Sequence, residues 1–218
     1  MARKLKIYIE ATPKRAFACA VEWPGWCRSG RDADAATEAL IAYADRYKKA
    51  MGRAATFSPP KDRSDVEVVH RLKGNASTEY GIPGASSPSD KRPISAAELQ
   101  RLHQLLQAAW ATFDGTAKAA SGVELRKGPR GGGRSLAKIV EHVREADEAY
   151  VTRLGARAPK GGDVKALRAR IIETLEARVT GKPITNPAEV KTIWEPRYAV
   201  RRAAWHALDH AWEIEDRS

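Results

Sequence analysis

Apolar residues spaced three and four apart dominate the second half of the chain, and this periodicity constrains the fold more than any other feature of the sequence. Such spacing gives a helix one apolar face. The segments that carry it, together with their caps and first-turn prolines, predict four helices, at about 95–120, 135–154, 163–179 and 196–218. Four helices with one long connection predict an all-α bundle over residues 94–218.

The first 73 residues have a different pattern, rich in strand-forming residues and punctuated by turn formers. The pattern predicts strands at 5–10 and 16–22, a short third strand after Trp26, a helix at 34–51 and a closing strand at 66–72. Residues 74–93 contain turn formers without a helical period, which predicts a linker. We therefore expect an α+β protein: a small ββ(β)αβ domain over residues 1–73, a linker, and a helical bundle.

Three histidines in the predicted bundle have a spacing that suits one metal ion. His206 and His210 are four residues apart in the last helix, so both imidazoles project from one face, one turn apart. His142 lies in the helix predicted at 135–154, which can bring it opposite the pair if the two helices are antiparallel. Three neutral imidazoles that leave coordination positions open are typical of a catalytic metal site. The alternative is that the histidines are ordinary core or surface residues.

The region from about Ser95 to Ser218 resembles the DinB-like superfamily of metal-binding four-helix bundles. The resemblance rests on a histidine in the second helix and a His-x-x-x-His pair in the last, which are His142, His206 and His210 here, and on the ending His-Ala-Leu-Asp-His-Ala-Trp-Glu-Ile-Glu-Asp-Arg. It implies that these histidines hold one divalent ion, Zn, Ni, Fe or Mn. Because the superfamily includes thiol-dependent transferases and isomerases, the resemblance also adds a low-molecular-weight thiol as an optional cofactor.

The N-terminal region resembles the HicB-like antitoxin domain. This resemblance rests on the segment Val-Glu-Trp-Pro-Gly-Trp at 21–26, followed by a glycine turn and a helix. It implies a module that binds a partner or nucleic acid. A small docking or dimerisation module is the alternative that we prefer.

Two further residues are candidates for catalysis. Arg202 lies one turn before His206, and Glu213 three residues after His210, so a helix places all four on one stripe. Arg202 is a candidate for holding an anionic substrate group, or else it pairs with an acid on the helix surface. Glu145, one turn after His142, is a candidate general base or hydrogen-bond partner of a ligand imidazole, or else a solvated surface acid.

A basic, glycine-rich turn at 126–134 precedes the helix that carries His142. It is either a flexible connection or an anion cradle, in which Arg134 and backbone N–H groups at the helix N-terminus bind a carboxylate or phosphate of a cofactor or substrate. It lacks the Gly-Lys-Ser/Thr ending of a P-loop, which argues against nucleoside triphosphates.

Composition narrows the partners. A net charge of +11 leaves nucleic acid open, but acidic residues are interspersed with the basic ones, which disfavours it. The absence of a long apolar run and of a signal peptide predicts a cytoplasmic protein with no membrane partner. The two cysteines, Cys19 and Cys27, are expected to be reduced thiols, since a disulfide framework needs more.

The functional hypothesis is a metal-dependent enzyme of the DinB-like type, a hydrolase or a thiol transferase acting on a small anionic or electrophilic substrate. The alternative is a non-enzymatic regulatory or stress-response protein, with a bundle that senses metal and a HicB-like module that binds a partner or nucleic acid. A homodimer is left open in both cases.

Overall fold

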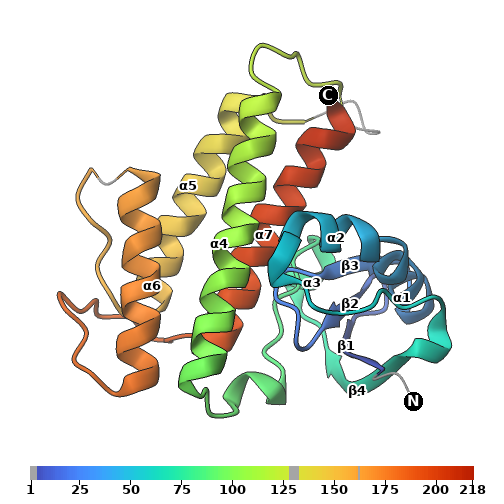
Figure 1. Ribbon diagram of the computed structural model, residues 1–218, viewed down its shortest axis with the longest axis horizontal. Coiled ribbons are helices and arrows are strands. Elements are labelled where there is room, and N and C mark those ends of the chain that lie inside the picture. Colours follow the sequence, from blue (N-terminus) through green and yellow to red (C-terminus); the bar gives the residue numbers. More distant parts are fainter. Residues whose placement is uncertain (1–3, 128–132, 162) are drawn as a thin grey trace. The chain divides into compact units, whose positions relative to one another are not determined.

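The computed structural model describes residues 4–127, 133–161 and 163–218. The chain forms two compact units, which divide between Arg92 and Pro93. The first contains a four-stranded sheet and the second contains the long helices (Figure 1). The expected α+β class is therefore confirmed.

The sheet of the first unit consists of β1 (Leu5–Ala11), β2 (Ala16–Ala20), β3 (Cys27–Gly30) and β4 (Val66–Lys73). The strand order is β3-β2-β1-β4; β1 pairs antiparallel with β2 and parallel with β4. The predicted strands match, except that β2 ends two residues earlier than expected. In β1 and β4 the β-branched Ile and Val residues explain this agreement, because such side chains fit a pleated surface.

The helical segment of the first unit is divided in two, where one helix was predicted. It comprises α1 (Ala33–Ala42) and α2 (Ala44–Met51), which meet at Tyr43, whose backbone leaves helical angles with φ −90° and ψ 3°. Trp26 packs under both helices: its indole N–H donates to the carbonyl of Leu40 at 2.9 Å, and its ring stacks on that of Tyr47 at 5.1 Å. Trp26 thus belongs to the core of this unit.

The prediction of two reduced thiols is wrong. Cys19 of β2 and Cys27 of β3 face each other in the antiparallel register and form a disulfide. The cysteine count could not reveal this pair, because it is created by the register of the hairpin.

The segment predicted as a linker is part of the first unit up to Arg92. It contains α3 (Ala76–Glu79) and a 3-10 turn at Pro88–Lys91; two further 3-10 turns lie at Gly52–Ala54 and Arg63–Asp65. The buried carboxylate of Glu10 on β1 holds the segment, accepting hydrogen bonds from the Thr78 hydroxyl and from the backbone N–H groups of Gly84 and Ala85 at 3.0 and 2.9 Å. Donors from this segment thereby satisfy the buried carboxylate oxygens of Glu10.

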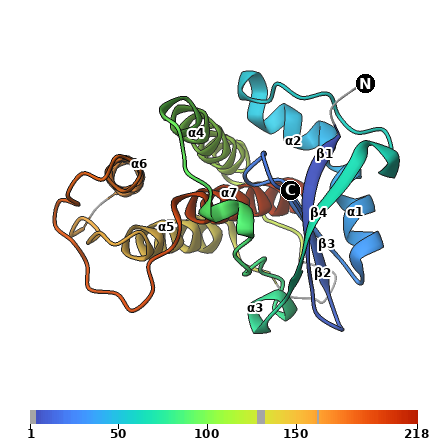
Figure 2. The same ribbon diagram turned by 90° about the horizontal axis from the view of Figure 1, so that it is seen from below.

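The second unit consists of α4 (Ala96–Ala119), α5 (Leu136–Arg153), α6 (Val164–Thr180) and α7 (Pro196–Arg217). The predicted helices are confirmed to within a residue or two at most ends. Local signals set these ends: the side chains of Ser95 and Asp163 cap the N-termini of α4 and α6, and Gly181 ends α6 with φ 70°. Helix α7 packs against α4 and α5, and α6 packs against α5 (Figure 2).

A charged network ties three helices of this unit together. Arg168 on α6 binds the carboxylate of Asp114 on α4 with two hydrogen bonds, at 2.6 and 3.0 Å, and that of Asp147 on α5 at 3.2 Å. Asp147 is only 2% exposed. Burial raises its pKa to about 6, although Arg168 opposes the shift.

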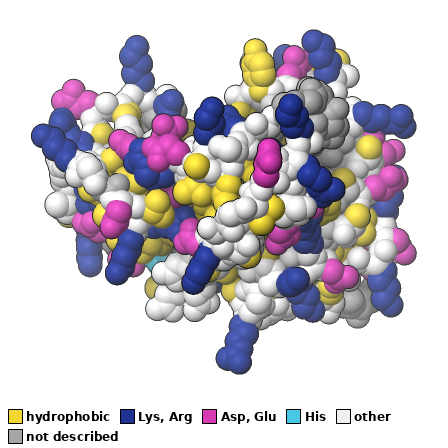
Figure 3. All heavy atoms as spheres, turned by 90° about the horizontal axis from the view of Figure 1, so that it is seen from above, with side chains coloured by type: hydrophobic (Ala, Val, Ile, Leu, Met, Phe, Trp, Pro, Cys, Tyr) yellow, Lys and Arg dark blue, Asp and Glu magenta, His cyan; other side chains and the backbone are white. Residues whose placement is uncertain are grey.

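The surface carries both signs of charge. On the face drawn in Figure 3, Lys and Arg side chains are dispersed among Asp and Glu side chains and uncharged surface. None of the helices in the described part of the chain has the length and apolar character needed to cross a lipid bilayer.

Candidate metal centre

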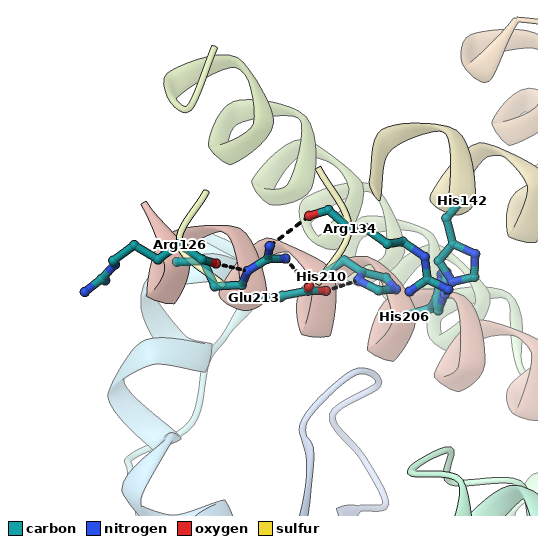
Figure 4. A network of polar contacts seen from close by, with 7 residues as sticks. Arg126, Arg134, His142, His206, His210 and Glu213 are labelled. Atoms are coloured by element: carbon teal, nitrogen blue, oxygen red, sulfur yellow. Dashed lines mark hydrogen bonds and ion pairs between the residues drawn. The ribbon is translucent and has the colours of Figure 1, made fainter. Parts of the chain in front are cut away.

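The three histidines meet inside the second unit. Helix α5 carries His142 near its start, and α7, which runs in the opposite direction, carries His206 and His210 (Figure 1). One ligand atom from each residue lies within 4.8 Å of those of the other two. The ring centroids are 4.9, 5.0 and 4.6 Å apart, so the imidazoles form a nearly regular triangle (Figure 4). The predicted convergence of the three residues is confirmed.

The closest contact in the triangle joins two ring nitrogens. Nε2 of His142 lies 3.1 Å from Nε2 of His206. Such a pair either shares one proton or turns both lone pairs toward one cation. Two nitrogens held about 2.0 to 2.1 Å from one Zn²⁺, at an angle between a right angle and a tetrahedral one, stand about 2.8 to 3.4 Å apart. The observed separation therefore fits a shared divalent ion.

The electrostatics around His142 and His206 favour neutral imidazoles, the form that binds metals. Burial lowers the pKa of His206 well below its usual value, and the neighbouring histidines, Arg202 and Arg134 lower it further. Burial, followed by the charge of Arg134, also lowers the pKa of His142. Both side chains are thus ready to donate a lone pair at neutral pH.

His210 has a carboxylate partner. Its Nδ1 lies 2.8 Å from Oε2 of Glu213, one turn further along α7. Because a carboxylate only accepts hydrogen bonds, the ring proton of the neutral imidazole belongs on Nδ1, which leaves the lone pair of Nε2 for a metal. Nδ1 of His206, by contrast, is buried and has no hydrogen-bond partner within the described residues.

Glu145, the predicted catalytic acid, is not the carboxylate that contacts His210. Glu145 lies exposed on α5, and its negative charge opposes the lowering of the pKa of His142. The carboxylate that contacts a ligand imidazole is that of Glu213. The sequence contained the signal for this contact, because three residues separate His210 from Glu213 and this spacing brings helical side chains together.

Arg202 is buried on α7, one turn before His206. Its guanidinium lies 4.9 Å from the ring centroid of Trp205, and its charge contributes to the lowered pKa of His206. Tyr150, which was not predicted from the sequence, lies beside His206, with the two rings edge-on and their centroids 6.1 Å apart. Burial raises the pKa of Tyr150 to about 12, so its hydroxyl stays protonated at neutral pH. The sequence signal for this proximity was the position of Tyr150, about two helical turns after His142.

Arg134 extends its side chain toward the three histidines from the segment that precedes α5 (Figure 4). Its charge acts on both His142 and His206. The rest of the expected anion cradle is only partly visible, because residues 128–132, including Arg130, lie outside the described residues.

Two other side chains of the bundle, His103 and Tyr198, have contacts with residues outside the triangle. His103 on α4 faces α6, where its Nδ1 is 3.7 Å from a carboxylate oxygen of Glu176. Tyr198 packs edge-on against Trp194, with ring centroids 4.9 Å apart.

Comparison with models of protein families, with curated proteins and with solved structures gave no match to this chain. The resemblances to DinB-like and HicB-like proteins therefore stay predictions from the sequence.

Proposed function

We propose that the second unit is a divalent-metal-dependent enzyme domain of the DinB-like type, with His142, His206 and His210 as ligands. The observation that carries this proposal is the triangle of imidazoles from two antiparallel helices. Its support is chemical: three neutral nitrogen donors suit Zn, Ni, Fe or Mn, and three protein ligands leave a position open for a reactant.

The reaction class follows from the donors and their neighbours. A divalent ion at this site would supply Lewis acidity, which makes a water molecule or a low-molecular-weight thiol a nucleophile near neutral pH. Hydrolysis or thiol transfer would then occur on a small electrophilic or anionic substrate. The two guanidinium groups of Arg134 and Arg202 favour a substrate that carries a carboxylate or phosphate.

The other polar side chains have complementary roles in this proposal. Arg202, buried beside His206, would orient the anionic group of the substrate. The hydroxyl of Tyr150 would donate a hydrogen bond, because it remains protonated. Glu145, exposed on the helix of His142, would accept a proton and release it to solvent.

A regulatory protein is the second candidate. The net charge of +11 leaves it open, because a basic protein attracts nucleic acid and acidic partners. In this case the bundle senses metal and the HicB-like first unit binds the partner, without turnover of any substrate.

Measurements of metal content and activity on the same preparation test the proposal. The purified protein is expected to contain about one divalent ion per chain; when loaded with that ion, it should transfer a thiol to an electrophile or hydrolyse an activated ester, and chelation should abolish the activity. Metal without any such activity, combined with a salt-sensitive mobility shift of nucleic acid, would favour the regulatory candidate. Protein that binds no divalent ion would contradict both.

A further inference from the structure

Arg217, near the end of α7, holds three separate groups with one guanidinium. Its Nη1 donates to Oε1 of Glu213 at 2.6 Å, its Nε to the carbonyl of Arg126 at 2.8 Å, and its Nη2 to the carbonyl of Arg134 at 2.8 Å (Figure 4). The backbone N–H of Arg126 donates in return to the carbonyl of Arg217 at 2.8 Å. The side chain is only 12% exposed, so these bonds are largely shielded from water.

Glu213 relays this anchorage to the metal centre. Its two carboxylate oxygens are divided between two partners: Oε1 accepts from Arg217, and Oε2 accepts from Nδ1 of His210. A carboxylate fixed at one oxygen cannot rotate freely at the other, so Arg217 restricts the ring orientation of His210 through Glu213. Groups of this kind set the orientation and tautomer of a ligand histidine.

The same guanidinium also fixes the backbone from which Arg134 extends toward His142 and His206. Gly133 lies against the guanidinium of Arg217. A side chain at Gly133 would put its Cβ 2.5 Å from Nη2 and 2.8 Å from Cζ of Arg217, and the backbone at Gly133 has φ +144°. The absence of a side chain there makes room for the arginine.

We propose that Arg217 is a positioning residue that couples two parts of the site, the ligand His210 through Glu213 and the anion-binding Arg134 through its carbonyl. This inference rests on the proposed metal site. It assigns no contact between Arg217 and substrate. It makes the geometry of the proposed metal site depend on the last turn of α7.

Zinc affinity tests the relay, measured by competition with a chromophoric chelator on the full-length protein. Glu213→Gln and Arg217→Ala should each weaken zinc binding about 10- to 100-fold, the range found for groups that orient a metal ligand. Because Arg217 acts through Glu213, the double variant should bind zinc no more weakly than the weaker single variant. Losses that multiply in the double variant would overturn the relay.

Matched variants keep the test decisive. Arg144→Ala removes an arginine that pairs with surface acids on α5, and it should leave zinc affinity unchanged. Arg217→Lys keeps the charge but cannot reach three acceptors, so it should weaken zinc binding if the position of the guanidinium matters. The visible spectrum of the Co²⁺-loaded protein should change in the same variants, reporting an altered ligand geometry.

The outcomes separate this inference from the proposed function. Wild-type protein that binds no zinc would refute the metal site itself. Tight binding by the wild type that persists unchanged in Glu213→Gln and Arg217→Lys, both folded by circular dichroism, would refute the positioning role alone.

Discussion

Nε2 of His142 and Nε2 of His206 lie 3.1 Å apart, although 64 residues separate them in the chain. Burial lowers the pKa of both residues, so the charged imidazolium form is disfavoured and their lone pairs are available to a divalent ion. The proposed metal site depends on this contact.

Zinc should raise the melting temperature of the protein, because an ion that binds the folded state alone stabilises it by mass action, by about 2.7 kcal/mol at one hundred times the dissociation constant. His206→Ala should lose this rise, since it removes one of three ligands. Differential scanning fluorimetry with and without zinc measures the effect. His103→Ala is the matched control; it changes a helix histidine that lies by Glu176 and should retain the rise. An equal zinc response in both variants would contradict the triad.

Asp147 should make stability depend on pH. Its pKa is raised to about 6 in the folded state from an ordinary 3.8, so the folded state binds the proton more tightly than the unfolded state. Its contribution is therefore fully present below about pH 4 and is lost as the pH rises through 6, a change on the order of 3 kcal/mol. Asp147→Asn does not titrate there.

Urea unfolding of both proteins, metal-free, at several pH values from 4 to 7 tests this expectation. As the pH rises, the free energy of unfolding of Asp147→Asn should increase relative to that of the wild type. The depressed pKa of His206 acts in the opposite sense over part of this range, but both proteins share it and the difference cancels it. A difference that stays constant with pH would show that Asp147 ionises normally in the folded protein.

Glu10 should stabilise the first unit. Replacing it by Ala leaves the donors of Thr78, Gly84 and Ala85 without their acceptor, which should cost about 3 kcal/mol. Limited proteolysis should then cut within residues 74–92, which the wild type protects. Glu67→Ala, at an exposed position on β4, is the control and should change stability by less than about 0.5 kcal/mol. Equal protease resistance in the two variants would refute the role of Glu10.

Local signals explain how much of the fold could be predicted. Helix α7 begins at Pro196 and α6 is capped by Asp163, as the sequence indicated, because first-turn prolines and side-chain caps act within a few residues. The convergence of the three histidines was predictable for a similar reason: a four-residue spacing fixes His206 and His210 on one face, and only the partner helix of His142 had to be inferred.

Contacts between distant residues escaped prediction. Residues 74–92 lack a periodic pattern, and only the folded position of Glu10, more than 70 residues away from Gly84, shows why they are ordered. The pairing of Cys19 with Cys27 depends on a hairpin register that the cysteine count does not contain. The contacts of Arg217 with the carbonyls of Arg126 and Arg134 were missed because backbone acceptors leave no mark in the sequence; its pairing with Glu213, four residues earlier on the same helix, was the available signal.

X-ray absorption of the zinc-loaded protein tests the central claim most directly, because it identifies and counts the atoms bound to the ion. We expect three imidazole nitrogens at about 2.0 to 2.1 Å from the zinc ion. In His142→Ala the shell should contain two imidazoles, or zinc should be lost. Sulfur at about 2.3 Å, or an imidazole count that His142→Ala leaves unchanged, would contradict it.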